Sequence, residues 1–178
     1  MRYTLNYTYN YSAIEPLSLG TFTTPDCATF YDVLRNDEHP ETVASTEYNV
    51  DADSEVLLAI GHQHTGALNI SMFVNGKFAC ASYPTYGTEE GVAGNEKGYL
   101  VGMSHCIDET TGPLLLKKGD KVRLDSWYFV GSNDPRILYS DGTHMGVMGY
   151  MYTAYRVTGA TLASGRLASP SRARSFSF

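Results

Sequence analysis

The stretch Val-Leu-Leu-Ala-Ile-Gly-His-Gln-His, residues 56–64, decides how this chain folds. An apolar run of this length, followed closely by the alternating residues 68–74, is typical of β-strands. Residues two apart in a strand point to the same face, so the imidazoles of His62 and His64 should project together, with Gln63 turned away. Two neighbouring imidazoles supply half of a metal site, because neutral imidazole binds zinc, copper, iron and nickel.

A second segment carries thioethers and one more histidine. Residues 142–151 read Gly-Thr-His-Met-Gly-Val-Met-Gly-Tyr-Met. A soft thioether added to two imidazoles favours copper, especially Cu(I). The alternative is that the histidines are solvated or hydrogen-bonded strand residues and the methionines fill the core, since two ligands do not make a site. The pattern alone leaves both interpretations open.

The rest of the chain also favours strands. It contains 14 Tyr and 17 Gly, with many Thr and Val and few segments of helical periodicity. Asn75-Gly76 predicts a hairpin turn, and residues 117–120 predict another tight turn. A long loop is expected over residues 83–98, and strands are expected at 3–11, 27–34, 43–50, 55–62, 67–74, 77–82, 99–106, 121–130 and 147–157. Many short strands without intervening helices predict an all-β, antiparallel, jelly-roll-like β-sandwich.

Length and charge limit the domain count and the partners. The chain has 178 residues, 43% of them hydrophobic, which is enough for one complete core. We expect a single sandwich domain over residues 1–164 and a Ser/Arg-rich tail over 165–178. The formal net charge of −6 argues against a nucleic-acid-binding surface. No apolar run approaches the roughly 20 residues of a membrane-spanning helix, so neither nucleic acid nor a membrane span is expected.

The cysteines and the N-terminus bear on the cellular compartment. One interpretation pairs Cys80 with Cys106 in a disulfide and leaves Cys27 over, whereas composition alone favours three reduced thiols. The first residues lack the apolar segment of a signal peptide, so the chain is expected to be intracellular, or a mature or truncated form. Acceptor sequences for N-glycosylation, which favour secretion, begin at Asn6, Asn10 and Asn69. Between these alternatives, we expect a secreted or extracytoplasmic protein.

Four segments, in this order along the chain, together carry a resemblance. They are residues 60–66 (Ile-Gly-His-Gln-His-Thr-Gly), 80–87 (Cys-Ala-Ser-Tyr-Pro-Thr-Tyr-Gly), 94–99 (Gly-Asn-Glu-Lys-Gly-Tyr) and 144–149 (His-Met-Gly-Val-Met-Gly). These segments resemble the plant stress-up-regulated nodulin family. That family in turn resembles the C-terminal copper domain of peptidylglycine α-hydroxylating monooxygenase and dopamine β-monooxygenase, and the likeness covers roughly residues 55–157.

The resemblance implies a ligand set. By position, His62, His64 and Met148 match the ligands of the oxygen-binding copper in those monooxygenases. Two imidazoles and one thioether would leave an open coordination position and favour Cu(I). Zinc at the two histidines is the alternative metal, with the thioether then a bystander. Met145 or Met151 is an alternative sulfur ligand, although strand alternation places Met148 and Met151 on opposite faces.

The chain departs from these enzymes in two respects. Their N-terminal domain holds a second, electron-supplying copper through three histidines, whereas residues 1–55 contain only His39. The disulfide beside their methionine ligand is also missing, because the matching positions lie near Trp127 and at Gly149. We therefore expect a copper-binding domain that resembles the oxygen-binding half of such an enzyme and lacks the second copper domain. Any catalysis would be that of a monooxygenase-like oxidoreductase.

The alternative function is that of a structural or assembly subunit, which keeps the fold without catalysis. The alternating tyrosines of residues 3–11 and the tail over 165–178 offer surfaces for homo- or hetero-oligomer contacts. The tyrosine alternation equally fits a half-buried sheet face. A hydrolase ranks last, because the sequence contains no nucleophile elbow and no His-Glu-x-x-His motif.

Overall fold

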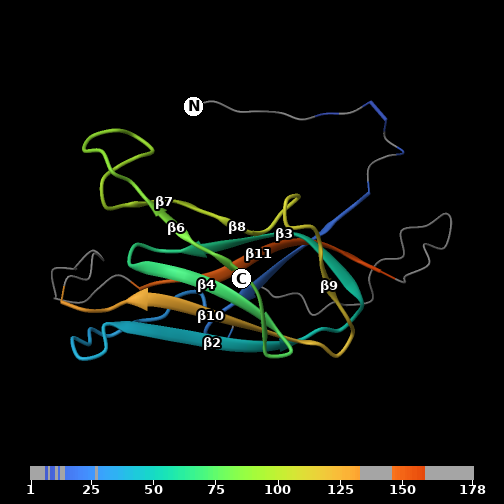
Figure 1. The fold of residues 1–178 in the computed structure, drawn as a ribbon, viewed down its shortest axis with the longest axis horizontal. Helices are drawn as coiled ribbons and strands as arrows, with labels where there is room; N and C mark the ends of the chain where they lie inside the picture. The colour runs from blue at the N-terminus through green and yellow to red at the C-terminus, as the bar shows by residue number, and fades with distance from the viewer. Residues whose placement is uncertain are drawn as a thin grey trace.

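The computed structural model describes residues 7, 9, 10, 12, 15–26, 28–132 and 146–158. The regular elements of this part of the chain are all strands (Figure 1). In chain order they are β1 (Ser18–Thr23), β2 (Glu41–Asn49), β3 (Ser54–Gln63), β4 (Ala67–Val74), β5 (Lys77–Ser82), β6 (Pro84–Tyr86), β7 (Leu100–Met103), β8 (His105–Ile107), β9 (Leu114–Leu116), β10 (Lys121–Phe129) and β11 (Gly149–Val157). Among the described residues there is no helix that is long and apolar enough to cross a membrane.

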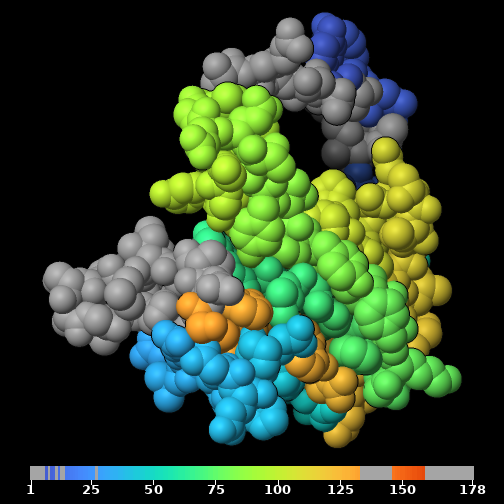
Figure 2. All heavy atoms as spheres, turned by 60° about the vertical axis from the view of Figure 1, so that its left-hand side comes forward, coloured from blue at the N-terminus to red at the C-terminus, as the bar shows by residue number. Residues whose placement is uncertain are grey.

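The described strands stack as a β-sandwich of two antiparallel sheets (Figure 1). One sheet has the order β1-β11-β3-β8, with β9 also paired to β3, and the other has the order β2-β10-β4-β5. β6 and β7 pair separately, and Figure 2 shows this hairpin and its loop standing out from the body of the sandwich. The all-β antiparallel sandwich is thus confirmed, while its description as a jelly roll stays a prediction.

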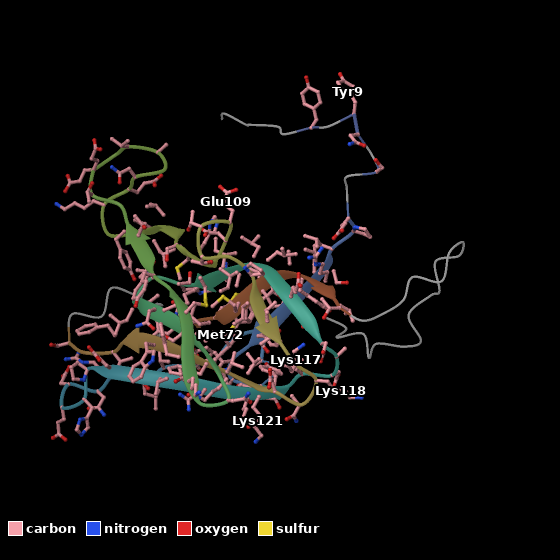
Figure 3. The ribbon with its side chains drawn as sticks, turned by 45° about the vertical axis from the view of Figure 1, so that its right-hand side comes forward. Tyr9, Met72, Glu109, Lys117, Lys118 and Lys121 are labelled. Atoms are coloured by element: carbon pink, nitrogen blue, oxygen red, sulfur yellow. A yellow bond between two sulfur atoms is a disulfide. The ribbon has the colours of Figure 1, made fainter. Side chains whose placement is uncertain are left out.

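The core follows from strand alternation. Each long strand turns every second side chain toward the opposite sheet, and those side chains fill the space between the layers. Met72 of β4, fully buried, lies in this interior (Figure 3). The main buried cluster draws on both sheets and contains Val56, Ala59, Ile70, Met72, Val122, Leu124 and Met151.

A disulfide links the two sheets through the core. Cys80 of β5 and Cys106 of β8 are bonded, with Cα atoms 5.2 Å apart. β5 belongs to one sheet and β8 to the other, so the bond crosses the sandwich. The interpretation with a Cys80–Cys106 disulfide is therefore confirmed over that with reduced thiols. Cys27 lies outside the described residues.

Both predicted turns are present. Asn75 and Gly76 have φ values of 51° and 77° and join β4 to β5, as the left-handed conformation of a two-residue hairpin turn requires. In the turn before β10, the amide of Asp120 donates to the carbonyl of Lys117 at 2.9 Å. Figure 3 shows Lys117 at this corner of the sandwich. These turns fix the register of β4, β5 and β10.

Other strand predictions were wrong. Within residues 3–11, the described Tyr7, Tyr9 and Asn10 form no strand, and the rest of that segment lies outside the described residues. The rings of Tyr7 and Tyr9 pack on each other with centroids 5.6 Å apart, and both side chains are largely exposed. Residues 28–34 contribute only an isolated bridge between Tyr31 and Val147.

Three short strands were not predicted. β1 and β9 lie at sheet margins, and β6 lies within the segment expected to be a loop. The burial of β1 shows no clean alternation, so its sequence lacks the periodic signal that marks a strand. The tail predicted over residues 165–178 lies outside the described residues, and the assembly surfaces assigned to it and to residues 3–11 stay a prediction.

Candidate metal centre

The two predicted histidines lie side by side. His62 is near the end of β3 and His64 follows that strand directly. Their ring centroids are 5.7 Å apart, with the ring planes at 79°. Gln63 between them is only 3% exposed and points into the core, as strand alternation predicts. The imidazoles therefore share the outer face of the sheet.

Gln63 anchors this end of β3 to the opposite sheet. Its side-chain amide donates to the hydroxyl of Ser126 on β10 at 2.9 Å and to the carbonyl of Asn69 on β4 at 3.1 Å. A third acceptor, the carbonyl of Trp127, lies at 3.3 Å. Because these contacts fix the rotation of the strand about its axis, the flanking imidazoles are held facing away from the core.

A tyrosine hydroxyl separates β3 from the start of β11. The β3–β11 ladder ends where Gln63 pairs with Gly149. At the next position, the amide of His64 donates to the Tyr128 hydroxyl at 2.7 Å, and this hydroxyl donates to the carbonyl of Met148 at 2.6 Å. The side chain of Tyr128 thus stands between the two backbones, where a direct ladder bond would otherwise form.

On the other edge of β3, a serine hydroxyl likewise stands between two backbones. The pairing with β8 ends at Ile60 and His105. The amide of Gly61 donates to the Ser82 hydroxyl at 3.0 Å, and that hydroxyl donates to the carbonyl of Ser104. The approach is so close that a Cβ at Gly61 would lie 2.8 Å from the Ser82 oxygen. Only glycine fits here without displacement of its neighbours.

Met148 lies on the histidine side of the sheet. Gly149 pairs with Gln63 at the end of the β11–β3 ladder, so continuing the register by one step sets Met148 opposite His64. Val147 and Gly149, on either side of Met148, are buried toward the core, and alternation therefore turns the Met148 side chain to the outer face. The alternative ligand Met151 is fully buried in the core on the opposite face, and Met145 lies outside the described residues.

The ring of His64 is held in one tautomer. Its Nδ1 lies 3.0 Å from the carbonyl oxygen of Gly146. A carbonyl can only accept, so Nδ1 carries a proton, and in the neutral ring Nε2 then keeps its lone pair. Histidines that bind metals usually donate their other ring N–H to a carbonyl or carboxylate in this way. The free Nε2 is therefore suited to bind an ion.

The ring of His62 packs among aromatic side chains. It stacks on Tyr150 at 25° with centroids 5.9 Å apart, and it meets the ring of Tyr152 at the same centroid distance. Partial burial, and secondarily the neighbouring His64, lower the pKa of His62. The lowered pKa keeps the imidazole neutral at neutral pH, which is the form that binds a metal. The hydroxyl of Tyr150 donates to the carbonyl of Thr29 at 2.6 Å and fixes the stacked ring.

The spacing of the imidazoles fits a shared ion. With a metal–nitrogen distance of about 2.0–2.1 Å and about 1.1 Å from nitrogen to ring centroid, two rings on one ion have centroids at most about 6.4 Å apart. The observed 5.7 Å lies within this limit. The described residues include no group of three or more His, Cys, Asp or Glu side chains that could hold a metal. Among the described side chains, a third ligand beside the two imidazoles would therefore be of another type, such as a thioether.

The histidines line an open groove of about 490 Å³. One wall is the end of β3, with Ile60 and Thr65 flanking the histidine pair. The other wall is β7, which contributes Leu100, Val101 and Met103. β7 pairs with β6 in a separate two-stranded sheet, so it faces the end of β3 across the groove. A small molecule in the groove would therefore meet two imidazoles on one side and aliphatic side chains on the other.

Sequence reasoning missed the groups that hold the histidines in place. Gln63 was expected only to turn away, and neither Tyr128 nor Ser82 was singled out. Both hydroxyls come from strands that are remote in sequence, within runs that look like ordinary half-buried strands. No signal in a single sequence marks them, because their role depends on which strands become neighbours.

The position that corresponds to the monooxygenase disulfide contains a tight contact between strands. A Cβ at Gly149 would lie 2.8 Å from the Cβ of Ser126 and 2.8 Å from the Cγ2 of Thr24. The space beside Met148 is thus filled by the close approach of β11 to β10. A larger residue at position 149 would displace this packing.

Comparison with known proteins places the chain in a family. No curated protein matches the sequence. Among solved structures, a family 35 carbohydrate binding module from Clostridium thermocellum is similar at 11% sequence identity and a TM-score of 0.28, over 77% of this chain and 90% of that chain. The family described as Stress up-regulated Nod 19 matches residues 2–156. Since this match spans most of the sequence, the chain belongs to the stress up-regulated Nod 19 family.

Proposed function

We propose that this protein binds one copper ion through His62, His64 and Met148, as a domain resembling the oxygen-binding half of copper monooxygenases. The observation that carries the proposal is the pair of imidazoles, 5.7 Å apart on the face to which Met148 alternates. The hydrogen bond from His64 Nδ1 to Gly146 supports it, because Nε2 is left free. Two imidazoles and a thioether form a donor set that favours Cu(I) over zinc.

The residues around the pair suit a redox site. When bound, a copper ion would supply one-electron chemistry and an open coordination position for dioxygen. The neutral His62 ring, stacked on Tyr150, would bind without competition from a proton at neutral pH. Leu100 and Val101 on the facing wall of the groove would hold the apolar part of a small substrate. Electrons would have to come from another domain, a partner or a small reductant, because residues 1–55 offer only His39.

We also propose that the protein works in an oxidising, extracytoplasmic compartment. The disulfide between Cys80 and Cys106 supports this location, since structural disulfides persist mainly in oxidising environments. Fractionation of the cells that express the protein would test the assignment. Recovery of the full-length chain only from the cytosol, with both thiols free to react with an alkylating agent after denaturation, would contradict it.

The copper proposal is tested by measuring bound metal per chain. Purified protein is offered Cu(I) and Zn(II) in equal amounts, desalted and analysed for both metals. We expect one copper per chain in the wild type and loss of that copper in His62→Ala and His64→Ala. His105→Ala is the matched control, because this exposed histidine contacts Asp108 and lies outside the pair. Met148→Leu should lose the preference for Cu(I) and keep weaker binding through the two imidazoles.

Two outcomes would overturn the proposal. A wild type that retains no copper, and whose melting temperature is unchanged when Cu(I) is added, would show that the pair holds no copper. A wild type that takes zinc from the equal mixture, with Met148→Leu indistinguishable from it, would assign the site to zinc.

A further inference from the structure

Tyr128 reaches the candidate metal centre from the opposite sheet. It belongs to β10, and its fully buried ring crosses the core toward the end of β3. Its hydroxyl accepts from the amide of His64 at 2.7 Å and donates to the carbonyl of Met148 at 2.6 Å. One hydroxyl therefore contacts the backbones of two of the three proposed ligands. These two residues are remote in sequence and come from separate segments.

The hydroxyl replaces a direct bond between those segments. In a continuous antiparallel ladder, the amide of His64 would donate to the carbonyl of Met148. Here the ladder ends one pair earlier, at Gln63 and Gly149, and the two groups bond to Tyr128 instead. The strands are thereby held apart at the level where the His64 and Met148 side chains emerge. The ring of Tyr31 packs edge-on against Tyr128, with centroids 6.2 Å apart, and supports it from the side.

We propose that Tyr128 is a positioning residue for the metal centre, because its hydroxyl sets the separation between the segments that carry His64 and Met148. This inference rests on the proposed copper function. Groups that orient metal ligands through hydrogen bonds tune affinity without touching the ion.

Tyr86 provides a matched control. Its hydroxyl also bridges two backbone groups, accepting from the amide of Gly66 at 3.1 Å and donating to the carbonyl of Ala67 at 2.8 Å. Both partners belong to one turn, and neither is a proposed ligand. Tyr86→Phe thus removes the same hydroxyl from the same kind of bridge. Any effect of Tyr128→Phe that is absent from Tyr86→Phe belongs to the bridge between His64 and Met148.

The first experiment measures copper binding by Tyr128→Phe, Tyr86→Phe and the wild type. We expect Tyr128→Phe to bind Cu(I) roughly 10- to 100-fold more weakly, the loss typical of removing a group that orients ligands. Its Cu(II) form should also show a changed electron paramagnetic resonance spectrum. Tyr86→Phe should match the wild type in both. A folded Tyr128→Phe with wild-type affinity and spectrum would overturn the proposal.

A metal-free measurement separates this proposal from the copper proposal. The hydrogen bond from His64 Nδ1 to the carbonyl of Gly146 joins the same two segments that Tyr128 bridges. Nitrogen-15 spectra of the histidine rings should therefore show His64 as the Nδ1–H tautomer in wild type and Tyr86→Phe, and as a mixture of tautomers in Tyr128→Phe. If the wild type binds no copper but the His64 tautomer still changes in Tyr128→Phe, the copper function fails and the positioning role stands. Unchanged His64 signals in Tyr128→Phe would overturn the positioning role.

If Tyr128→Phe does not fold, a measurement on the wild-type protein tests the positioning role. Tyrosine labelled with carbon-13 at Cζ reports on each hydroxyl separately. Addition of Cu(I) should shift the Cζ resonance of Tyr128 more than that of Tyr86, because Tyr128 bonds to the backbone of two proposed ligands and Tyr86 to that of none. Equal responses, or a response of Tyr86 alone, would overturn the proposal.

Discussion

At the scale of single residues, Gln63 and Gly61 hold the histidine pair in place. The amide of Gln63 is tied to both β4 and β10, so a rotation of this strand would break hydrogen bonds inside the core. The side-chain carbonyl oxygen of Gln63 is buried without a partner among the described residues. The free-energy cost of burying it offsets part of the stabilisation from the hydrogen bonds of the side-chain amide. Gly61 lets the strand approach Ser82, whose hydroxyl then satisfies the Gly61 amide.

The first prediction concerns Gly61. A Cβ at this position would lie 2.5 Å from Ile70 Cγ2 and 2.8 Å from the Ser82 hydroxyl. Overpacking of this kind typically costs about 1–3 kcal/mol, so Gly61→Ala should lower the free energy of unfolding by that amount. Chemical denaturation measures it. Gly102→Ala is the control, because its Cβ would meet only Thr85, at 3.9 Å, and equal stability of the two variants would contradict the prediction.

At the scale of elements, the long strands could be predicted and the short ones could not. β2 and β3 alternate in burial over 9 and 10 residues, and β4, β10 and β11 are apolar runs of 8 or 9 residues with a partial alternation, both visible in the sequence. β1 and β9 are short and held mainly by pairing with a neighbour, so their existence depends on a sheet that the local sequence does not encode. The described Tyr7, Tyr9 and Asn10 show the converse, since an alternating sequence forms no strand there.

The second prediction concerns the link between β5 and β8. The disulfide joins residues separated by 26 positions. The chain-entropy model gives about 3–4 kcal/mol for a loop of this length. Cys80→Ala combined with Cys106→Ala should therefore lower the free energy of unfolding by at least that amount, measured by denaturation under oxidising conditions. A reductant should lower the denaturation midpoint of the wild type toward that of the double variant and leave the double variant unchanged.

At the scale of the whole molecule, the candidate centre depends on both sheets. The sequence suggested that the imidazoles share a face, because strand periodicity is a local property. The family resemblance brought Met148 into the set, and the register of β11 on β3 puts it on the same face. The support from Tyr128 could not be predicted, because it requires β10 to pack across the core against the end of β3. The candidate ligands could thus be predicted from the local sequence pattern and the resemblance, whereas the groups that position them could be identified only in the folded structure.

The third prediction is that the sandwich unfolds as one unit. The main core cluster includes residues of both sheets, and the disulfide crosses between them. Fluorescence of Trp127 reports on the sheet of β10, and the ring protons of His62 report on the sheet of β3. Their denaturation midpoints should coincide with the midpoint from far-ultraviolet circular dichroism. Separate midpoints would show that the two sheets lose their structure independently.

The burial of the disulfide determines when it can be reduced. Cys80 and Cys106 are 9% and 2% exposed, so a soluble reductant reaches the sulfurs only when the layers part. Reduction is therefore limited by the opening of the protein, and the bond survives a later transfer into a reducing milieu for as long as the native state lasts. In a molecule that stays folded, the oxidation state of this pair is therefore set when the chain folds.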